Sequence, residues 1–326
     1  MPSLLKPNQH TIKQQISCCG VGLHSGRTAN LTLKPAPVDK GIRFFRTDLG
    51  ENICVKAHMD KVVDTRLATT IGDNGVTVST TEHLLAALRS SGIDNANIEL
   101  DSAEVPIMDG SAEPFFKLLK SAGKLKQSGF RKILKITKPI TYNSGDSYIT
   151  VTPYDGFKIT GKISFDDTLI QTQEYNIEMS SERFSREIAR ARTFGYVEQV
   201  EELWANGLAL GSTLENVIAI HWNRKSILNE DGLRYQDEFI RHKVLDLAGD
   251  LTLLGCPMLG HVYSYKAGHR QHLGFMEAIA DAPDSWEYLA MNKNGKHSVI
   301  DQVRSGTKSA SDMIMPFFRT RQQAVA

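Results

Sequence analysis

Residues 229–255 constrain the fold most, because their pattern predicts a helix with apolar side chains on almost every side. Asp237 can cap this helix and Gly255 can end it. A helix that is apolar all round belongs in the core of a protein. One polar stripe still runs down it, formed by His242, Lys243, Asp246 and Asp250. Because burying such groups without partners costs several kcal/mol, we expect partners for them nearby.

His242 and Asp246 lie one helical turn apart on this stripe. At this i, i+4 spacing two side chains can hold a single metal ion. The same spacing also lets the imidazole and the carboxylate form a hydrogen bond to each other. The pair alone therefore leaves both a metal site and a structural pair open.

The composition is that of an ordinary globular protein. The chain has 326 residues, of which 41% are hydrophobic, and a formal net charge of +1. This length is sufficient for two domains. The scattered lysines and arginines form no basic field, so we expect no nucleic-acid partner. Without a signal-peptide pattern or a long apolar run, we expect a cytoplasmic protein with no stable membrane insertion. Four irregularly spaced cysteines predict reduced thiols.

The first part of the chain alternates like antiparallel strands. Three glycines within residues 20–26 resemble a phosphate-binding loop. Residues 29–33 then alternate as a strand instead of starting a helix, so a hairpin connection is favoured. His24, at the tip of this loop, can still face a ligand. Residues 65–78 predict another hairpin, with its turn at residues 73–75.

The period changes at Ser79, which together with Glu82 fits the capping box at the start of a helix. Glu82 therefore has a structural explanation as good as a chemical one. His83 has none, because an imidazole at the N-terminus of an apolar helix tends to stay neutral, the form that binds metal. Ser111 is placed to cap a second helix, which Gly123 ends.

The polar segment 122–131 is punctuated by glycines and resembles a linker. We place the boundary there, which gives an N-terminal domain at residues 1–127 and a C-terminal domain at residues 128–305. The remaining residues 306–326 form a tail of unknown role.

Two features of the second domain bear on function. Residues 192–210 predict a small βαβ unit whose helix, residues 197–206, has one apolar face. That face can equally pack on its own sheet. A sharp turn at residues 266–269 then follows a strand and leaves His269 free to point into a cleft.

Taken together, these residues predict a hydrolytic metal site. His83, His242 and Asp246 offer two nitrogens and one oxygen, which suit a single Zn²⁺ ion with a fourth position open for water. Bound zinc lowers the pKa of its water to about 7. Glu82 can accept that proton. His269, oriented by Asp250, can donate one to a leaving group. Lys243 and Thr193 are candidates to hold an oxyanion or a substrate phosphate.

Several long sequence blocks resemble one known family, the UDP-3-O-acyl-N-acetylglucosamine deacetylases, which are zinc amidases of lipid A biosynthesis in Gram-negative bacteria. The resemblance covers residues 10–296. The blocks are GVGLHSG (20–26), STTEHLLAAL (79–88), GIDN (92–95), PIMDGSAEPF (106–115), ARTFG (191–195), LNEDGLRYQDEFIRHKVLDLAGDL (228–251) and YKAGH (265–269).

The resemblance implies a role for each candidate residue. His83, His242 and Asp246 are expected to hold one zinc ion, with Glu82 as general base and His269 as general acid. Asp250 is expected to support His269, Thr193 to contact the oxyanion and Lys243 to contact the substrate. The further residues expected to contact substrate are Phe194 at the sugar, Phe165 and Lys266 toward the nucleotide, and Leu23 and His24 of the glycine loop.

The resemblance also implies an architecture and a reaction. The fold is expected to be α+β, with two similar domains, each a β-sheet with two helices, stacked as a β-α-α-β sandwich with a small insert in each domain. The second insert, residues 192–220, is expected to form a passage for an acyl chain. The expected reaction removes the N-acetyl group of UDP-3-O-(3-hydroxyacyl)-N-acetylglucosamine and releases acetate, the committed step of lipid A biosynthesis. We expect a monomer whose partner is its acylated UDP-sugar substrate.

One departure from the family pattern is Ala68, where many members carry a cysteine near the metal. Effects of that thiol on a second metal ion should be absent here. Two alternative functions are also considered. A zinc-dependent nucleotide-sugar binding protein explains the ligands but not Glu82 and His269 together. A zinc peptidase shares the base and metal but lacks the HExxH helix.

Overall fold

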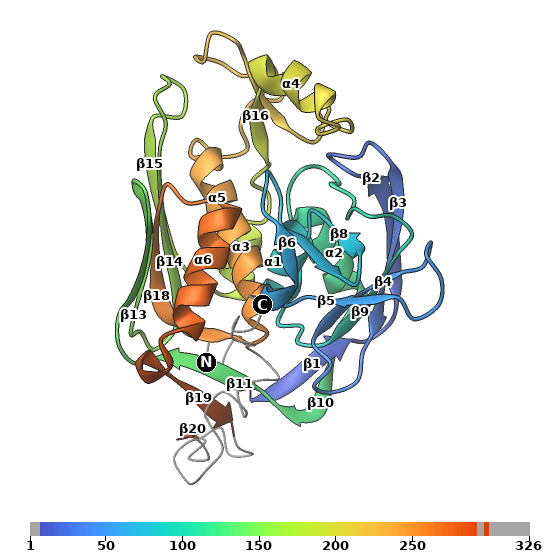
Figure 1. The fold of residues 1–326 in the computed structure, drawn as a ribbon, viewed down its shortest axis with the longest axis vertical. Helices are drawn as coiled ribbons and strands as arrows, with labels where there is room; N and C mark the ends of the chain where they lie inside the picture. Colours follow the sequence, from blue (N-terminus) through green and yellow to red (C-terminus); the bar gives the residue numbers. More distant parts are fainter. Residues whose placement is uncertain (1–6, 292–296, 300–326) are drawn as a thin grey trace, which may run out of the picture.

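The computed structural model describes residues 7–291 and 297–299, with two sheets on the outside and helices between them (Figure 1). Helix α1 (Glu82–Ser91) of the first half packs against α5 (Glu238–Asp250) of the second half. This arrangement confirms the predicted α+β sandwich of β-α-α-β layers. Within the described residues, no helix is long and apolar enough to cross a membrane.

The first half contains a five-stranded sheet in the order β2-β3-β9-β4-β5. Alternate side chains of β3, including Leu31 and Leu33, are fully buried, as expected for a sheet with one face on the core. The helix α2 (Glu113–Ala122) packs beside α1. The strands are β2 (Ile16–Val21), β3 (Thr28–Pro35), β4 (Ile42–Arg46), β5 (Cys54–Lys56) and β9 (Ala96–Leu100).

The second half contains an eight-stranded sheet in which β18 is central. Strand β18 pairs with β13 in antiparallel register and with β14 and β11 in parallel register. The helices of this half are α3 (Ser181–Glu187), α5 and α6 (His269–Ala280). Its strands are β11 (Lys132–Ile136), β12 (Ile140–Ser144), β13 (Ser147–Thr152), β14 (Phe157–Ser164), β15 (Thr172–Glu178), β18 (Met258–Tyr265), β19 (Trp286–Met291) and β20 (His297–Val299).

Each half carries a small additional unit. In the first half it is a three-stranded sheet of β6 (Val62–Asp64), β7 (Thr70–Asp73) and β8 (Val76–Val78), which includes the predicted hairpin. In the second half, β16 (Phe194–Tyr196) pairs in parallel with β17 (Ile218–Ile220), and α4 (Val200–Ala205) lies between them in the chain. Short 3-10 turns are η2 (Met59–Lys61), η3 (Val197–Gln199), η4 (Leu251–Leu254) and η5 (Pro283–Ser285).

The predicted βαβ unit is correct in type but wrong in its second strand. Residues 208–210 are not a strand, and β17 takes that place. The reason is a contact between the two halves of the chain. The backbone N–H groups of Leu210 and Gly211 donate to the carbonyls of His24 and Leu23, so they are not available to a sheet.

The expected linker is also part of a sheet. Residues of β10 (Lys124–Phe130) pair antiparallel with β1 (Asn8–Ile12), so the polar segment supplies a strand on its way to the second half. Polar side chains suit this two-stranded pair because β10 is largely exposed. The domain boundary at residue 127 stays a prediction, and the tail at 306–326 lies outside the described residues.

The central helix α5 is buried as predicted, but its ends differ. Asp237 precedes the helix without capping it, because its carboxylate accepts a hydrogen bond from Arg241 Nε at 2.6 Å. After Asp250 the chain tightens into η4 before Gly255 ends it with a φ of 78°. Gly249 is the point of closest approach to α1, since a Cβ there would lie 2.1 Å from the Glu82 carbonyl oxygen.

Candidate active site

The three predicted metal ligands meet where α1 crosses α5. His83 Nε2 lies 3.6 Å and His242 Nε2 lies 3.3 Å from the same atom, Asp246 Oδ1. All three side chains are buried, and the two imidazole rings are nearly perpendicular, with centroids 5.0 Å apart. Because these ligands come from opposite halves of the chain, the crossing of the helices creates the cluster.

Hydrogen bonds orient two of the three candidate ligands, His242 and Asp246. The Nδ1–H of His242 donates to the carbonyl of Ala191 at 3.0 Å, which leaves the lone pair on Nε2 facing Asp246. Burial lowers the pKa of His242 to about 4, so its imidazole is neutral at pH 7. Lys243 Nζ donates to Asp246 Oδ2 at 2.7 Å and leaves Oδ1 free.

The charge on Asp246 is stabilised strongly. Burial on its own favours the neutral acid, but electrostatic interactions with His242 and Lys243 hold the pKa of Asp246 well below its usual range. Asp246 Oδ1 accepts no hydrogen bond from the described residues. A buried carboxylate oxygen without a donor is costly, and a cation would satisfy it.

The spacing of these atoms fits a zinc ion. Tetrahedral zinc with bonds of about 2.0–2.2 Å places its ligand atoms about 3.3–3.5 Å apart. The two separations from Asp246 Oδ1, 3.3 and 3.6 Å, lie close to this range. His83, His242 and Asp246 together thus form a group that could hold a metal ion.

Glu82 and His269 lie beside this cluster and face each other. His269 Nε2 is 3.7 Å from Glu82 Oε1, while its Nδ1 lies 2.7 Å from Asp250 Oδ2. Since an ionised carboxylate only accepts, Nδ1–H is the donor, and Nε2 is the atom directed toward Glu82. This orientation brings one carboxylate oxygen and one imidazole nitrogen to within 3.7 Å of each other.

Burial and neighbouring charges shift the pKa values of Glu82, His269 and Asp250. Burial raises the pKa of Glu82 above its ordinary value. Burial favours neutral His269, but the charge of Asp250 and then that of Glu82 outweigh it and raise its pKa to about 9. For Asp250, burial opposes ionisation, yet the neighbouring imidazoles lower its pKa. His269 is therefore protonated and Asp250 ionised at neutral pH.

The capping-box interpretation of Glu82 is wrong. Helix α1 begins at Glu82, one residue after its N-cap Thr81, and Thr80 has a φ of 57° that turns the chain before the helix. The backbone N–H of Ser79 donates to Ala103, and the Glu82 carboxylate accepts from the backbone N–H of Thr69 at 3.2 Å. Glu82 is thus turned toward the site instead of toward its own helix end.

Thr193 and Phe194 belong to the start of the second insert, residues 192–220. The Thr193 N–H donates to the carbonyl of Gly110, and its carbonyl accepts from the N–H of Ile218. The ring of Phe194 packs at 6.3 Å from that of His242 and at 6.1 Å from that of Phe165. Phe194 therefore packs beside the candidate ligand His242, and Phe165 packs beside Phe194.

The remaining residues expected to contact substrate are Leu23, His24 and Lys266. The main chain of Leu23 and His24 is hydrogen-bonded to the second insert. Burial lowers the pKa of His24, against the charge of Glu104, which raises it. Lys266 follows strand β18 and pairs with Asp146 at 2.9 Å, an ion pair on the surface.

Sequence comparisons agree with this geometry. The sequence model of the UDP-3-O-acyl N-acetylglycosamine deacetylase family matches residues 9–281. The chain belongs to this family. It is 48% identical to the UDP-3-O-acyl-N-acetylglucosamine deacetylase of Oleidesulfovibrio alaskensis over 275 residues, covering 84% of this chain and 89% of that protein. It is 47% identical to the enzyme of the same name from Myxococcus xanthus over 282 residues, covering 86% and 89%.

Two residues of the site in this family member were missed by sequence reasoning. Thr69 reaches Asp250 with its hydroxyl at 2.6 Å, and the Nδ1–H of His272 donates to Asp250 Oδ2 at 2.7 Å. His272 follows His269 by three residues in α6, so its helical spacing could have revealed it. Thr69 is 181 residues from Asp250, and the sequence carries no signal for that contact.

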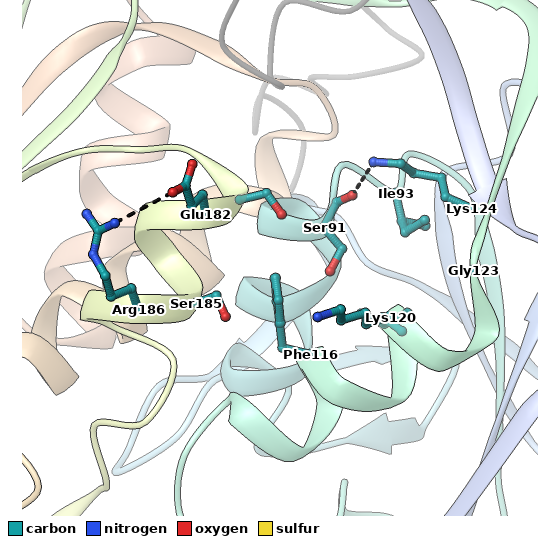
Figure 2. Close-up of a pocket in the computed structure, with 11 residues that line it drawn as sticks. Ser91, Ile93, Phe116, Lys120, Gly123, Lys124, Glu182, Ser185 and Arg186 are labelled. Carbon is teal, nitrogen blue, oxygen red and sulfur yellow. Dashed lines mark hydrogen bonds and ion pairs between the residues drawn. The ribbon is translucent and has the colours of Figure 1, made fainter.

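One cavity of about 630 Å³ lies away from the candidate residues (Figure 2). It lies at the C-terminal end of α1, where Phe116 of α2 faces Ser185 and Arg186 of α3, whereas Glu82 and His83 are at the other end of that helix. Two of its charged side chains already have partners within the protein. Lys124 donates a hydrogen bond to the Ser91 carbonyl, and Arg186 forms an ion pair with Glu182. The candidate active site is therefore separate from this cavity.

Proposed function

We propose that the protein hydrolyses the N-acetyl group of UDP-3-O-(3-hydroxyacyl)-N-acetylglucosamine and releases acetate, the committed step of lipid A biosynthesis. The observation that carries the proposal is the convergence of a cation-binding triad with an acid–base pair, Glu82 and His269, in a member of the deacetylase family. A protein that only binds nucleotide sugars has no need for this pair.

His83, His242 and Asp246 would hold one Zn²⁺ ion. When bound, the ion supplies Lewis-acid chemistry, because it acidifies water and polarises the amide carbonyl. Glu82 takes the proton of the attacking water, and its raised pKa brings it closer to the working pH of a general base. The water oxygen then forms a bond to the acetyl carbon.

His269 completes the reaction as general acid. Its Nε2 proton passes to the glucosamine nitrogen as the C–N bond breaks, so that acetate and a free amine leave. Asp250 holds the ring through Nδ1 and keeps it charged until that step. Acid and base assistance each supply roughly 10² to 10⁴ in rate.

Thr193 and Lys243 are proposed to stabilise the negative oxygen that develops on the acetyl carbon. Lys243 Nζ uses one N–H on Asp246, and an ammonium has two more to offer. Burial opposes the charge, but Asp246 raises the pKa of Lys243, so the ammonium stays charged. A preorganised donor of this kind is worth about 10² to 10³ in rate.

The second insert is proposed to bind the acyl chain. It carries three large side chains that are about half exposed, namely Trp204, Leu210 and Leu214. Each methylene that a substrate buries against such surface contributes about 0.8 kcal/mol. Phe194 and Phe165 are proposed to pack on the sugar and toward the nucleotide, with Lys266, Leu23 and His24 at the rim. We further propose that the protein acts as a monomer in the cytoplasm.

The test is acetate release from three substrates. Zinc-loaded protein is incubated with acylated UDP-N-acetylglucosamine, with UDP-N-acetylglucosamine lacking the acyl chain, and with an acetylated peptide. We expect acetate and free amine from the first in strong preference to the second, and none from the third. Binding of the sugar without acetate release would identify a binding protein, and cleavage of the peptide would identify a peptidase. Acetate release that persists after chelation and dialysis would refute the role of zinc.

A further inference from the structure

Thr69 lies in the loop before β7 and uses every polar group it has at the site. Its N–H donates to Glu82 Oε2 at 3.2 Å. Its carbonyl accepts from both the N–H and the hydroxyl of Thr81, the N-cap of α1. The side chain is only 2% exposed, so these contacts exclude solvent.

The Thr69 hydroxyl contacts His269, the other member of the acid–base pair, and its partner Asp250. Oγ1 donates to Asp250 Oδ1 at 2.6 Å and lies 3.1 Å from His269 Nδ1. Because both imidazoles of α6 donate to Asp250 Oδ2, Thr69 is the one donor to Oδ1 among the described residues. A carboxylate held at a single oxygen can rotate about its terminal torsion, which is broad, whereas donors at both oxygens fix it.

We propose that Thr69 is a positioning residue that fixes the general base and the general acid relative to each other. Its backbone holds Glu82, and its hydroxyl holds the carboxylate that orients His269. This role rests on the proposed deacetylase function, since it assumes that Glu82 and His269 move protons in that reaction. The loop before β7 thereby supplies the connection between α1 and α6, elements from opposite halves of the chain.

The substitution Thr69→Val separates the hydroxyl from the backbone contact. Valine keeps the shape and the N–H to Glu82 but removes the hydrogen bond to Asp250. We expect kcat to fall by about 10- to 100-fold with KM unchanged, since a hydrogen bond to a charged group contributes that much. Thr69→Ser should restore most of kcat. The matched control is Thr252→Val, because Thr252 is also buried but its hydroxyl bonds only to the carbonyls of Leu85 and Ala248.

A second measurement does not depend on turnover. In zinc-loaded protein with ¹⁵N-labelled histidine, the Nδ1 signal of His269 should shift in Thr69→Val and return in Thr69→Ser, while Thr252→Val leaves it unchanged. The positioning role would be overturned if the wild-type protein releases acetate and Thr69→Val has the same kcat and the same His269 signal as the wild type. The deacetylase function would then remain intact. Absence of wild-type acetate release would refute the proposed function and, with it, the positioning role of Thr69 in that reaction, even if the signal shifts.

Discussion

Replacing Asp250 with asparagine should move the alkaline limit of turnover. In the native site the pKa of His269 is about 9, compared with 6.5 for an ordinary histidine. This difference corresponds to roughly 3 kcal/mol in favour of the charged imidazole. Asp250, whose Oδ2 accepts from Nδ1 at 2.7 Å, is the largest contribution that raises the pKa against burial. Without that charge, the pKa should return to its ordinary value or below.

The size of the effect follows from the fraction of protonated acid. At pH 8 a group with a pKa of about 9 is roughly 90% protonated, and one with a pKa of about 6.5 is roughly 3% protonated. Turnover by Asp250→Asn should therefore fall roughly 30-fold at pH 8 and much less at pH 6. The sign is fixed, because the protonated form is the active one and is lost as pH rises through the pKa.

The assay is acetate release measured from pH 6 to pH 10 at saturating substrate, with zinc content and melting temperature checked for both proteins. The ratio of the two rates at pH 6 serves as the internal control for misfolding. If Asp250→Asn lowered the rate by the same factor at every pH, with the alkaline limit still near 9, then Asp250 would not set the proton affinity of the general acid.

Four further outcomes are expected. Glu82→Ala should keep the metal ion and lose turnover by at least about 100-fold, whereas His83→Ala should lose both; metal analysis beside acetate release distinguishes them. Chelation followed by dialysis should lower the melting temperature, because it leaves buried donors unpaired, and added zinc should restore it. Arg192→Met should lower the free energy of unfolding by about 3–5 kcal/mol in urea titrations, since it removes the counter-ion of the fully buried Glu238 carboxylate, whereas Arg66→Ala at an exposed pair should change little. Gly249→Ala should weaken metal binding, measured by competition with a chelator; unchanged affinity would mean that α1 shifts without moving His83.

Much of the site could be predicted from the sequence because its ligands carry local signals. His242 and Asp246 share a helix face, and His83 opens an otherwise apolar helix, so each residue conflicts with its surroundings in a way that the sequence reveals. The sandwich architecture came from the family resemblance, while periodicity alone indicated sheets and helices in each half. Local patterns were weaker at the ends of elements, where tertiary contacts decide the outcome.

Two of the three errors, at Ser79 and at residues 208–210, share one physical cause. Ser79, Asp237 and the strand expected at residues 208–210 were assigned from local hydrogen-bonding preference. In the structure, the Ser79 N–H donates to the distant carbonyl of Ala103. The backbone N–H groups of the second insert donate to the carbonyls of Leu23 and His24. Asp237 instead pairs with the Arg241 guanidinium on its own helix. A long-range contact leaves no period in the sequence, and for the same reason Thr69 was missed.

The close approach of α1 to α5 explains why this site needs both halves of the chain. Gly249 removes the side chain at the crossing, so the backbone of Glu82 comes within the space that a Cβ would fill. His83, the next residue, can then reach the face of α5 that carries His242 and Asp246. A glycine inside a helix costs about 1 kcal/mol relative to alanine. The absence of a side chain at Gly249 permits the short distance between the helices. This distance brings together His83 and Asp246, 163 residues apart in the chain, in a group that could hold a metal ion.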